Sequence, residues 1–325
     1  MKYLFLFIST FAFAQQTQFV DFKSVLGKIA VIPIEQTVFG DVDYDFEVLK
    51  SIDTIKIDAQ NMEFSDLKLN GKPINFSNTQ KQLQIIFPFK KGKNSLTFHY
   101  LAKPKQTMYF IGSEANDNVQ IWTQGQGKYT SHWFPSFDDV NEKVIFNLNI
   151  LFNKDYQVIS NGVLKFKSGL DGLSVWKYQM QKPMSSYLLM LTIGKFEKQT
   201  QKSNSGIPLE MYYESKDKSK FEPTYRYSKQ LFDFLEKEIG VKYPWEIYKQ
   251  APVRDFLYAG MENTSATLFS SRYVVDSTGF EDRNYTNVNA HELAHQWFGD
   301  LLQEHGKISR SFERALQSAG LFSGS

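Results

Sequence analysis

The sequence predicts an α+β fold, with an N-terminal antiparallel β domain followed by a mixed α and β domain. From about residue 31 to residue 196, apolar and polar side chains alternate, which is the pattern of strands with one buried face. After about residue 201 the apolar spacing changes to i, i+4, i+7, the period of an amphipathic helix. The chain has 325 residues, 42% of them hydrophobic, so its length and composition suit two domains with substantial cores.

The first domain is predicted to consist of long strands joined by tight turns. The alternation is strongest in four runs, at residues 42–48, 83–89, 95–101 and 144–152. Asn70-Gly71 and Asn161-Gly162 are dipeptides that favour hairpin turns. We interpret the basic residues 90–93, which lie between two of the runs, as a solvated hairpin turn. This pattern indicates a sandwich-like or saddle-like domain over residues 15–200.

The second domain is predicted to mix strands and helices. The polar segment 197–206 interrupts the alternation, and we place the domain boundary there, so that the second domain covers residues 201–325. One further strand is expected at residues 207–214. Apolar residues at helical spacing predict a helix that begins near Pro223: Tyr227, Leu231, Phe234 and Leu235. A second helix is predicted over residues 284–302, which lack proline.

Residues 1–14 have the pattern of a secretory signal peptide. Lys2 supplies a positive charge, the apolar run 3–13 is too short to span a bilayer, and Ala12-Phe13-Ala14 has the small-x-small pattern of a cleavage site. The alternative is a buried first strand. We therefore expect an exported protein, periplasmic or secreted, whose mature chain begins at Gln15.

Charge and cysteine content narrow the classes of partner. The formal net charge is +2, which gives no reason to expect a nucleic acid or an anionic membrane as partner. The sequence has no cysteine, so disulfides within it are excluded. No feature of the sequence indicates an oligomeric state.

A pair of histidines in the second predicted helix is the strongest functional signal. The string NAHELAHQWFGD places His291 and His295 four residues apart, about 40° around a helix axis, so both imidazoles can bind one zinc ion. Glu292 is adjacent, where it can hold a water molecule on the metal and accept its proton as a general base. The alternative is a buried helix whose histidines only form hydrogen bonds.

A second motif, YAGMENTSATLFS at residues 258–270, favours a peptidase. It is a glycine-containing turn that leads into a strand. Beside a zinc helix, Glu262 can bind the free amino group of a peptide, while exposed backbone around Gly260 pairs with the peptide as an added strand. Such an enzyme removes residues one at a time from the N-terminus. By itself, Glu262 could equally be a charge on an edge strand.

Four motifs together resemble those of the aminopeptidase N family of zinc metallopeptidases, which also includes a leukotriene epoxide hydrolase. They are WTQGQGKYTSHWFPSFDD, YPWEIYKQAPVRDF, AGMEN and HELAHQWFGD. The resemblance extends from about residue 40 to Lys307. It implies a saddle-like β domain, a thermolysin-like catalytic domain, one zinc ion as cofactor, and a peptide with a free N-terminus as substrate.

The resemblance also assigns roles to single residues. It implies that His291 and His295 are zinc ligands and that Glu292 is the general base. The AGMEN residues are implied to bind substrate, with the Glu262 carboxylate on the α-amine: Ala259, Gly260, Met261, Glu262 and Asn263. The family usually has glycine where Ala259 stands. Gln126 matches the position of a second amine-binding glutamate, and glutamine occurs there in the epoxide-hydrolase branch. Its alternative role is that of a polar residue at a strand end.

The resemblance stops after Lys307. In the family a glutamate further along the chain is the third metal ligand, and counting from His295 its position here is Arg314, with Glu313 one residue short. A shift of one residue turns a helical side chain by about 100°. We therefore expect either a chain truncated after the zinc-binding helix, with a frameshifted tail, or a remodelled site in which Glu313 or Glu304 reaches the ion.

The sequence as a whole predicts a zinc metallo-aminopeptidase with an incomplete catalytic domain, weakly active or inactive as this chain. A non-catalytic exported peptide-binding module is the alternative, because the β domain and the AGMEN edge could hold the amino end of a peptide without metal. Epoxide hydrolysis is a third hypothesis, suggested only by Gln126.

Overall fold

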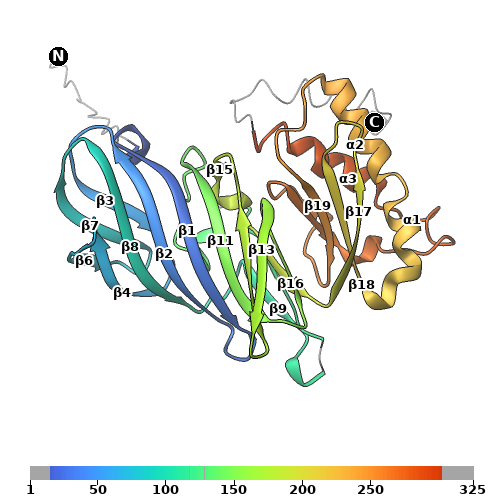
Figure 1. Cartoon of the computed structure of the whole chain (residues 1–325), viewed down its shortest axis with the longest axis horizontal. Coiled ribbons are helices and arrows are strands. Elements are labelled where there is room, and N and C mark those ends of the chain that lie inside the picture. Colours follow the sequence, from blue (N-terminus) through green and yellow to red (C-terminus); the bar gives the residue numbers. More distant parts are fainter. Residues whose placement is uncertain (1–14, 117, 128, 302–325) are drawn as a thin grey trace, which may run out of the picture.

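The computed structural model describes residues 15–116, 118–127 and 129–301. The predicted signal peptide and the candidate ligands Glu304 and Glu313 lie outside the described residues, as does Arg314. The described chain forms a β-rich N-terminal part and then a smaller part in which helices pack beside a sheet (Figure 1).

A large sheet forms the body of the first domain (Figure 1). Its strands follow the order β13-β14-β11-β1-β2-β8-β4-β5, and β15 pairs with one end of β11. Their bounds are Val163–Leu170 (β13), Leu173–Gln179 (β14), Lys143–Asn153 (β11), Val20–Ile32 (β1), Thr37–Val48 (β2), Gly92–Ala102 (β8), Met62–Leu69 (β4), Lys72–Pro73 (β5) and Met184–Ser185 (β15). β1 and β11 are parallel, with Gly27 opposite Leu148. The expected antiparallel domain thus contains a parallel pair, because the chain builds other strands after β8 and re-enters the large sheet beside β1.

Two smaller sheets complete the first domain and share its core. One has the order β3-β7-β6 and the other the order β12-β16-β10-β9. Their bounds are Ile52–Asp58 (β3), Gln82–Phe89 (β7), Phe76–Asn78 (β6), Gln157–Ser160 (β12), Leu191–Gly194 (β16), Gln120–Thr123 (β10) and Met108–Ile111 (β9). The alternation predicted from the sequence is confirmed in β2 and β11, where nearly every second side chain is buried. Inward residues such as Tyr44 and Phe146 pack in one core with Ile57 and Leu83 of the small sheet.

The predicted turns have different outcomes. Asn70-Gly71 joins β4 to β5 in a hairpin, as predicted. Within the predicted turn 90–93, residues 90 and 91 connect β7 to β8, which belong to different sheets, and Asn161-Gly162 likewise connects β12 to β13. The hairpin prediction is wrong at these two sites. A turn dipeptide predicts the local backbone conformation, such as the φ of 72° at Gly162. It does not predict which strand the next strand pairs with, because that depends on packing with side chains distant in the sequence.

The second domain contains a mixed sheet in the order β17-β18-β19-β21-β20. The bounds are Phe196–Lys202 (β17), Pro208–Glu214 (β18), Tyr248–Val253 (β19), Ala266–Ser270 (β21) and Gly260–Met261 (β20). β18, β19 and β21 are parallel, and every residue of β19 and β21 is buried. This is the burial expected of parallel strands that are covered on both faces.

β17 begins before the domain boundary that the sequence indicated. Residues 196–200 pair with β18 and so belong to the second sheet, not to the β domain that was assigned residues 15–200. In β17 only Phe196 is buried, and the polar residues after it are exposed. An edge strand that is solvated on both faces carries no alternating pattern, so no strand could be predicted there from the sequence.

The described helices of the second domain are α1 (Phe221–Tyr225), α2 (Ser228–Ile239) and α3 (Thr286–His295). The helix predicted near Pro223 is present, but it is divided into α1 and α2, and Tyr227, which was predicted on its apolar face, lies at the break and is 44% exposed. Leu235 of α2 is buried, and α2 ends at Ile239, followed by Gly240, whose φ of 70° is left-handed. None of the described helices has the length and apolar character that crossing a membrane requires.

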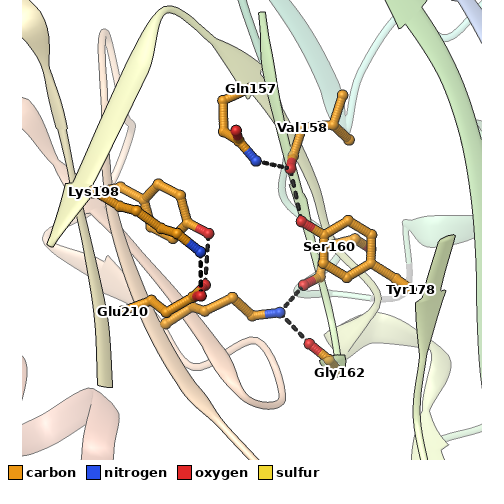
Figure 2. Close-up of polar contacts among 9 residues, drawn as sticks. Gln157, Val158, Ser160, Gly162, Tyr178, Lys198 and Glu210 are labelled. Carbon is orange, nitrogen blue, oxygen red and sulfur yellow. Dashed lines mark hydrogen bonds and ion pairs between the residues drawn. The ribbon is translucent and has the colours of Figure 1, made fainter. Parts of the chain in front are cut away.

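The two domains meet at a buried amine. Lys249 of β19 is 1% exposed, and its side-chain nitrogen donates hydrogen bonds to the carbonyl oxygens of Ser160 and Gly162 in the first domain. Figure 2 shows these two carbonyl groups turned toward the same nitrogen atom. That nitrogen also lies 4.8 Å from the centre of the Tyr178 ring. Burial lowers the pKa of Lys249 to about 7, and the negative charge of Glu210 opposes this shift.

The turn that Lys249 binds also contacts the segment between β20 and β21. The Asn161 side-chain amide donates to the Thr264 carbonyl at 2.8 Å. The Gly162 N–H donates to the Ser265 hydroxyl, also at 2.8 Å. The first domain therefore directly supports the segment that follows the AGMEN motif.

Candidate active site

The histidine motif lies at the C-terminal end of α3. The helix contains neither proline nor glycine, and Leu293 and Ala294 on its inner side are fully buried. It ends at His295, so the prediction of a helix to residue 302 is wrong. The Phe298 carbonyl bends back toward His295, and Gly299 adopts a φ of 126°, which a residue with a side chain rarely takes.

The two imidazoles point toward each other, as the four-residue spacing predicts. Their Nε2 atoms are 3.2 Å apart, and the ring planes cross at 84°. His295 Nδ1 lies 3.2 Å from the Phe298 carbonyl oxygen and donates its proton there, so Nε2 is the ring nitrogen that carries the lone pair of a metal ligand. Burial lowers the pKa of His291, and His295 lowers it further, so the His291 imidazole is neutral at neutral pH.

This spacing fits a tetrahedral zinc ion. Zinc binds histidine nitrogen at about 2.0–2.1 Å, which places two such nitrogens about 3.3 Å apart in a tetrahedral site. One oxygen each of Glu262 and Glu292 and one nitrogen of His295 lie within 4.8 Å of one another. Imidazole and carboxylate are both zinc ligands, so the donor set fits the metal. Catalytic zinc sites use three protein ligands, and the position of the third in the family, Arg314 here, lies outside the described residues.

The side chain of Glu292, a residue of α3, lies against Gly260 of β20. It is 5% exposed, and a Cβ added at Gly260 would come within 2.4 Å of its Oε1 atom. The missing side chain of Gly260 therefore leaves room for the carboxylate. Burial raises the pKa of Glu292 to about 9, and the negative charge of Glu262 adds to the shift. A cation beside both groups favours their charged forms, and the charged form is the one that accepts a proton.

The AGMEN motif forms an edge of the second sheet. β20 pairs with β21 on one side, and no described strand pairs with it on the other. Ala259, Gly260 and Glu262 are partly exposed, whereas Met261 and Asn263 are fully buried. An unpaired edge beside the histidines allows an extended peptide to add as a further strand.

Gln126 has no direct bond to this cluster in the described structure. Its side chain is exposed and accepts a 3.4 Å hydrogen bond from Gln124 Nε2. Among the described residues, no hydrogen bond or ion pair joins it to Glu262 or Glu292. The substrate-binding role of Gln126 stays a prediction, as do those of the AGMEN residues.

Sequence reasoning missed Gln296, which follows the second histidine. It is fully buried, and its side chain bonds both the AGMEN segment and Tyr243. The available signal is its position: Gln296 lies three residues after buried Leu293, so it faces the core, where a polar side chain needs partners. The sequence does not reveal which partners those are.

The sequence of this chain is similar to known protein families in both of its parts. Residues 21–188 match the family model of the Peptidase M1 N-terminal domain, and residues 224–305 match that of the Peptidase family M1 domain. Glutamyl aminopeptidase of Bos taurus is 30% identical over 176 residues, which cover 52% of this chain and 18% of that protein. Leucyl aminopeptidase of Saccharolobus solfataricus is 26% identical over 254 residues, which cover 77% of this chain and 32% of that protein.

Tricorn protease-interacting factor F2 of Thermoplasma acidophilum is 28% identical over 252 residues, which cover 76% of this chain and 32% of that protein. The chain thus spans a third or less of the length of these three relatives. The first family model alone covers more than half of the chain, and the second includes both AGMEN and the histidine motif. The chain therefore belongs to the M1 family of peptidases.

Proposed function

We propose that this chain carries the substrate and metal site of a zinc metallo-aminopeptidase, which removes N-terminal residues from peptides. The site consists of His291, His295, Glu292, Glu262 and the edge of β20. The observation that carries the proposal is the 3.2 Å approach of the His291 and His295 Nε2 atoms beside the carboxylates of Glu262 and Glu292. The names of the relatives, glutamyl and leucyl aminopeptidase, support the same reaction class.

Each residue of the site has a separate task in this proposal. His291 and His295 hold the zinc ion. When bound, zinc supplies a Lewis acid for the scissile carbonyl and lowers the pKa of a water molecule. Glu292 accepts the proton of the attacking water. Glu262 binds the ammonium group of the substrate, and the free edge of β20 aligns the peptide backbone.

Export belongs to the proposal as well. It rests on the signal-peptide pattern of residues 1–14. N-terminal sequencing of the protein recovered from the periplasm or medium should give Gln15 as the first residue. An uncleaved N-terminus in the cytoplasmic fraction would refute export without touching the proposed chemistry.

The proposed reaction is tested with a fluorogenic leucine anilide that carries a free amine and with its N-acetylated form. We expect slow, chelator-sensitive hydrolysis of the free-amine substrate only, lost in Glu292→Gln while bound zinc is retained. Equal hydrolysis of the acetylated substrate would contradict an aminopeptidase. A metal-free chain that binds free-amine peptides without cleaving them would instead establish the non-catalytic module.

A further inference from the structure

Gln296 is the point at which the metal helix and the amine-binding segment are joined. Its Nε2 group donates to the backbone carbonyls of Glu262 and Asn263, at 3.1 and 3.3 Å. Its Oε1 atom accepts from the Ser265 N–H at 2.7 Å and from the Tyr243 hydroxyl at 3.2 Å. Gln296 has no exposed surface, so water does not compete for these four hydrogen bonds.

The partners of Gln296 lie on both sides of the bend that carries the chain from β20 into β21. Glu262 and Asn263 precede the bend, and Ser265 lies within it, with a left-handed φ of 64°. A residue with a side chain rarely adopts that conformation, so it persists here because surrounding bonds hold it. One of these bonds is the one from the Ser265 N–H to the side chain of Gln296, which directly follows His295.

This connection differs from the support that comes from the first domain. The turn at Asn161 and Gly162 binds Thr264 and Ser265, which follow the motif. Gln296 binds the carbonyl of Glu262 itself. It therefore ties the backbone of the residue that faces the substrate amine to the helix that carries both histidines.

We propose that Gln296 is a positioning residue, which fixes the separation between the Glu262 carboxylate and the two histidines and thereby sets the affinity for the substrate amine. This inference rests on the proposed function, because it takes Glu262 as the amine-binding group. Gln296 itself touches neither substrate nor metal.

The test measures how much a free amine adds to binding. Leucine hydroxamate carries a zinc-binding hydroxamate and an α-amine, and 4-methylpentanoyl hydroxamate lacks only the amine. The ratio of their dissociation constants on the zinc-loaded chain is the amine advantage. Gln296→Leu, which has no polar side-chain atom, removes the donor to Glu262 and Asn263 together with the acceptor for Ser265. We expect it to reduce the amine advantage about tenfold or more, because both buried hydrogen bonds to the Glu262 and Asn263 carbonyls are lost, with zinc content and deamino binding unchanged.

Tyr243→Phe is the matched control. It removes the hydroxyl that bonds Gln296 Oε1 and leaves both Nε2 bonds in place. Its amine advantage should stay within about twofold of the wild type, since the donor arm is intact. An equal loss in both variants, with zinc binding weakened in parallel, would show a general packing role and overturn the proposal.

A second readout does not depend on amine binding. Hydrogen–deuterium exchange in Gln296→Leu should be faster in residues 262–266 than in the wild type, with β19 unchanged. Unchanged exchange at 262–266 would refute the positioning role by itself. If the wild type shows no amine advantage, the assignment of Glu262 fails, and the proposal for Gln296 fails with it. If Glu262→Gln abolishes the advantage while Gln296→Leu retains it, only the role of Gln296 is refuted.

Discussion

Replacing Lys249 by methionine tests whether a desolvated amine joins the two domains. Methionine keeps the length and apolar character of the lysine stem but removes the group that bonds the Ser160 and Gly162 carbonyls. The ordinary pKa of a lysine is 10.5, and burial lowers that of Lys249 to about 7 in the folded chain. In the window between these values, the unfolded chain binds one more proton than the folded chain.

The sign and size of the effect follow from proton linkage. Because the unfolded state binds more protons, the wild-type free energy of unfolding rises with pH from about 7 to 10.5, at about 1.4 kcal/mol per pH unit. The stability contribution is complete above the unfolded pKa and is lost as the pH falls toward 7. Between pH 7.5 and 9.5, the difference in unfolding free energy, wild type minus Lys249→Met, should increase by about 2.5 kcal/mol.

The comparison with the variant isolates Lys249 from other titrating groups. Burial raises the pKa of Glu142 to about 8 and that of Glu292 to about 9, and both shifts act on stability in the opposite direction. They are present in both proteins, so they cancel in the difference. Glu210 and Lys198, whose charges act on Lys249, are also unchanged.

The assay is urea unfolding followed by tryptophan fluorescence at pH 7.5, 8.5 and 9.5. Lys177→Met, at an exposed position of β14, is the control, and its difference from the wild type should not vary with pH. A flat difference for Lys249→Met as well would refute the reasoning, because it would mean that the amine is hydrated and that the domains do not close over it.

Three further substitutions test the site and its support. Gly260→Ala adds a Cβ 2.4 Å from Glu292 Oε1, so the carboxylate must move by about 1 Å; the hydrolysis rate should fall about 100-fold with zinc retained. Gly279→Ala, where the nearest atom is 3.5 Å away, is the control, and equal rates for the two variants would contradict the role of Glu292. Asn161→Ala removes the side chain that bonds the Thr264 and Leu188 carbonyls and the Met190 N–H. The free energy of unfolding, measured in urea, should fall by about 2–4 kcal/mol. A decrease below about 1 kcal/mol would contradict a tight domain junction. Glu262→Gln should lower the affinity for leucine hydroxamate about tenfold or more and leave that for the deamino analogue unchanged, and a parallel loss for both would exclude an amine-binding role.

The parts of the fold that the sequence predicts are those with a local pattern. β2 and β11 alternate because one face is buried, and α3 carries its histidines four residues apart because helical geometry sets that spacing. The approach of His291 to His295 is therefore readable from the sequence alone. The contact between Gly260 and Glu292 is not, because it depends on how β20 packs against α3.

The parts that the sequence does not predict are decided by distant partners. β17 has no alternating pattern because both of its faces are solvated, and Asn161-Gly162 serves a contact between domains instead of a hairpin. Gln296 is a polar residue without a motif of its own, and its importance appears only when the segment between β20 and β21, which it bonds, is placed beside it.

The central claim is that the C-terminal end of one short helix, α3, holds a divalent cation between two imidazoles. Calorimetric titration of the metal-free 325-residue chain with zinc tests it most directly. We predict one binding event per chain, lost in both His291→Ala and His295→Ala and retained in Glu292→Gln. Zinc binding of the same stoichiometry and affinity in the two histidine variants, or none in the wild type, would contradict the account.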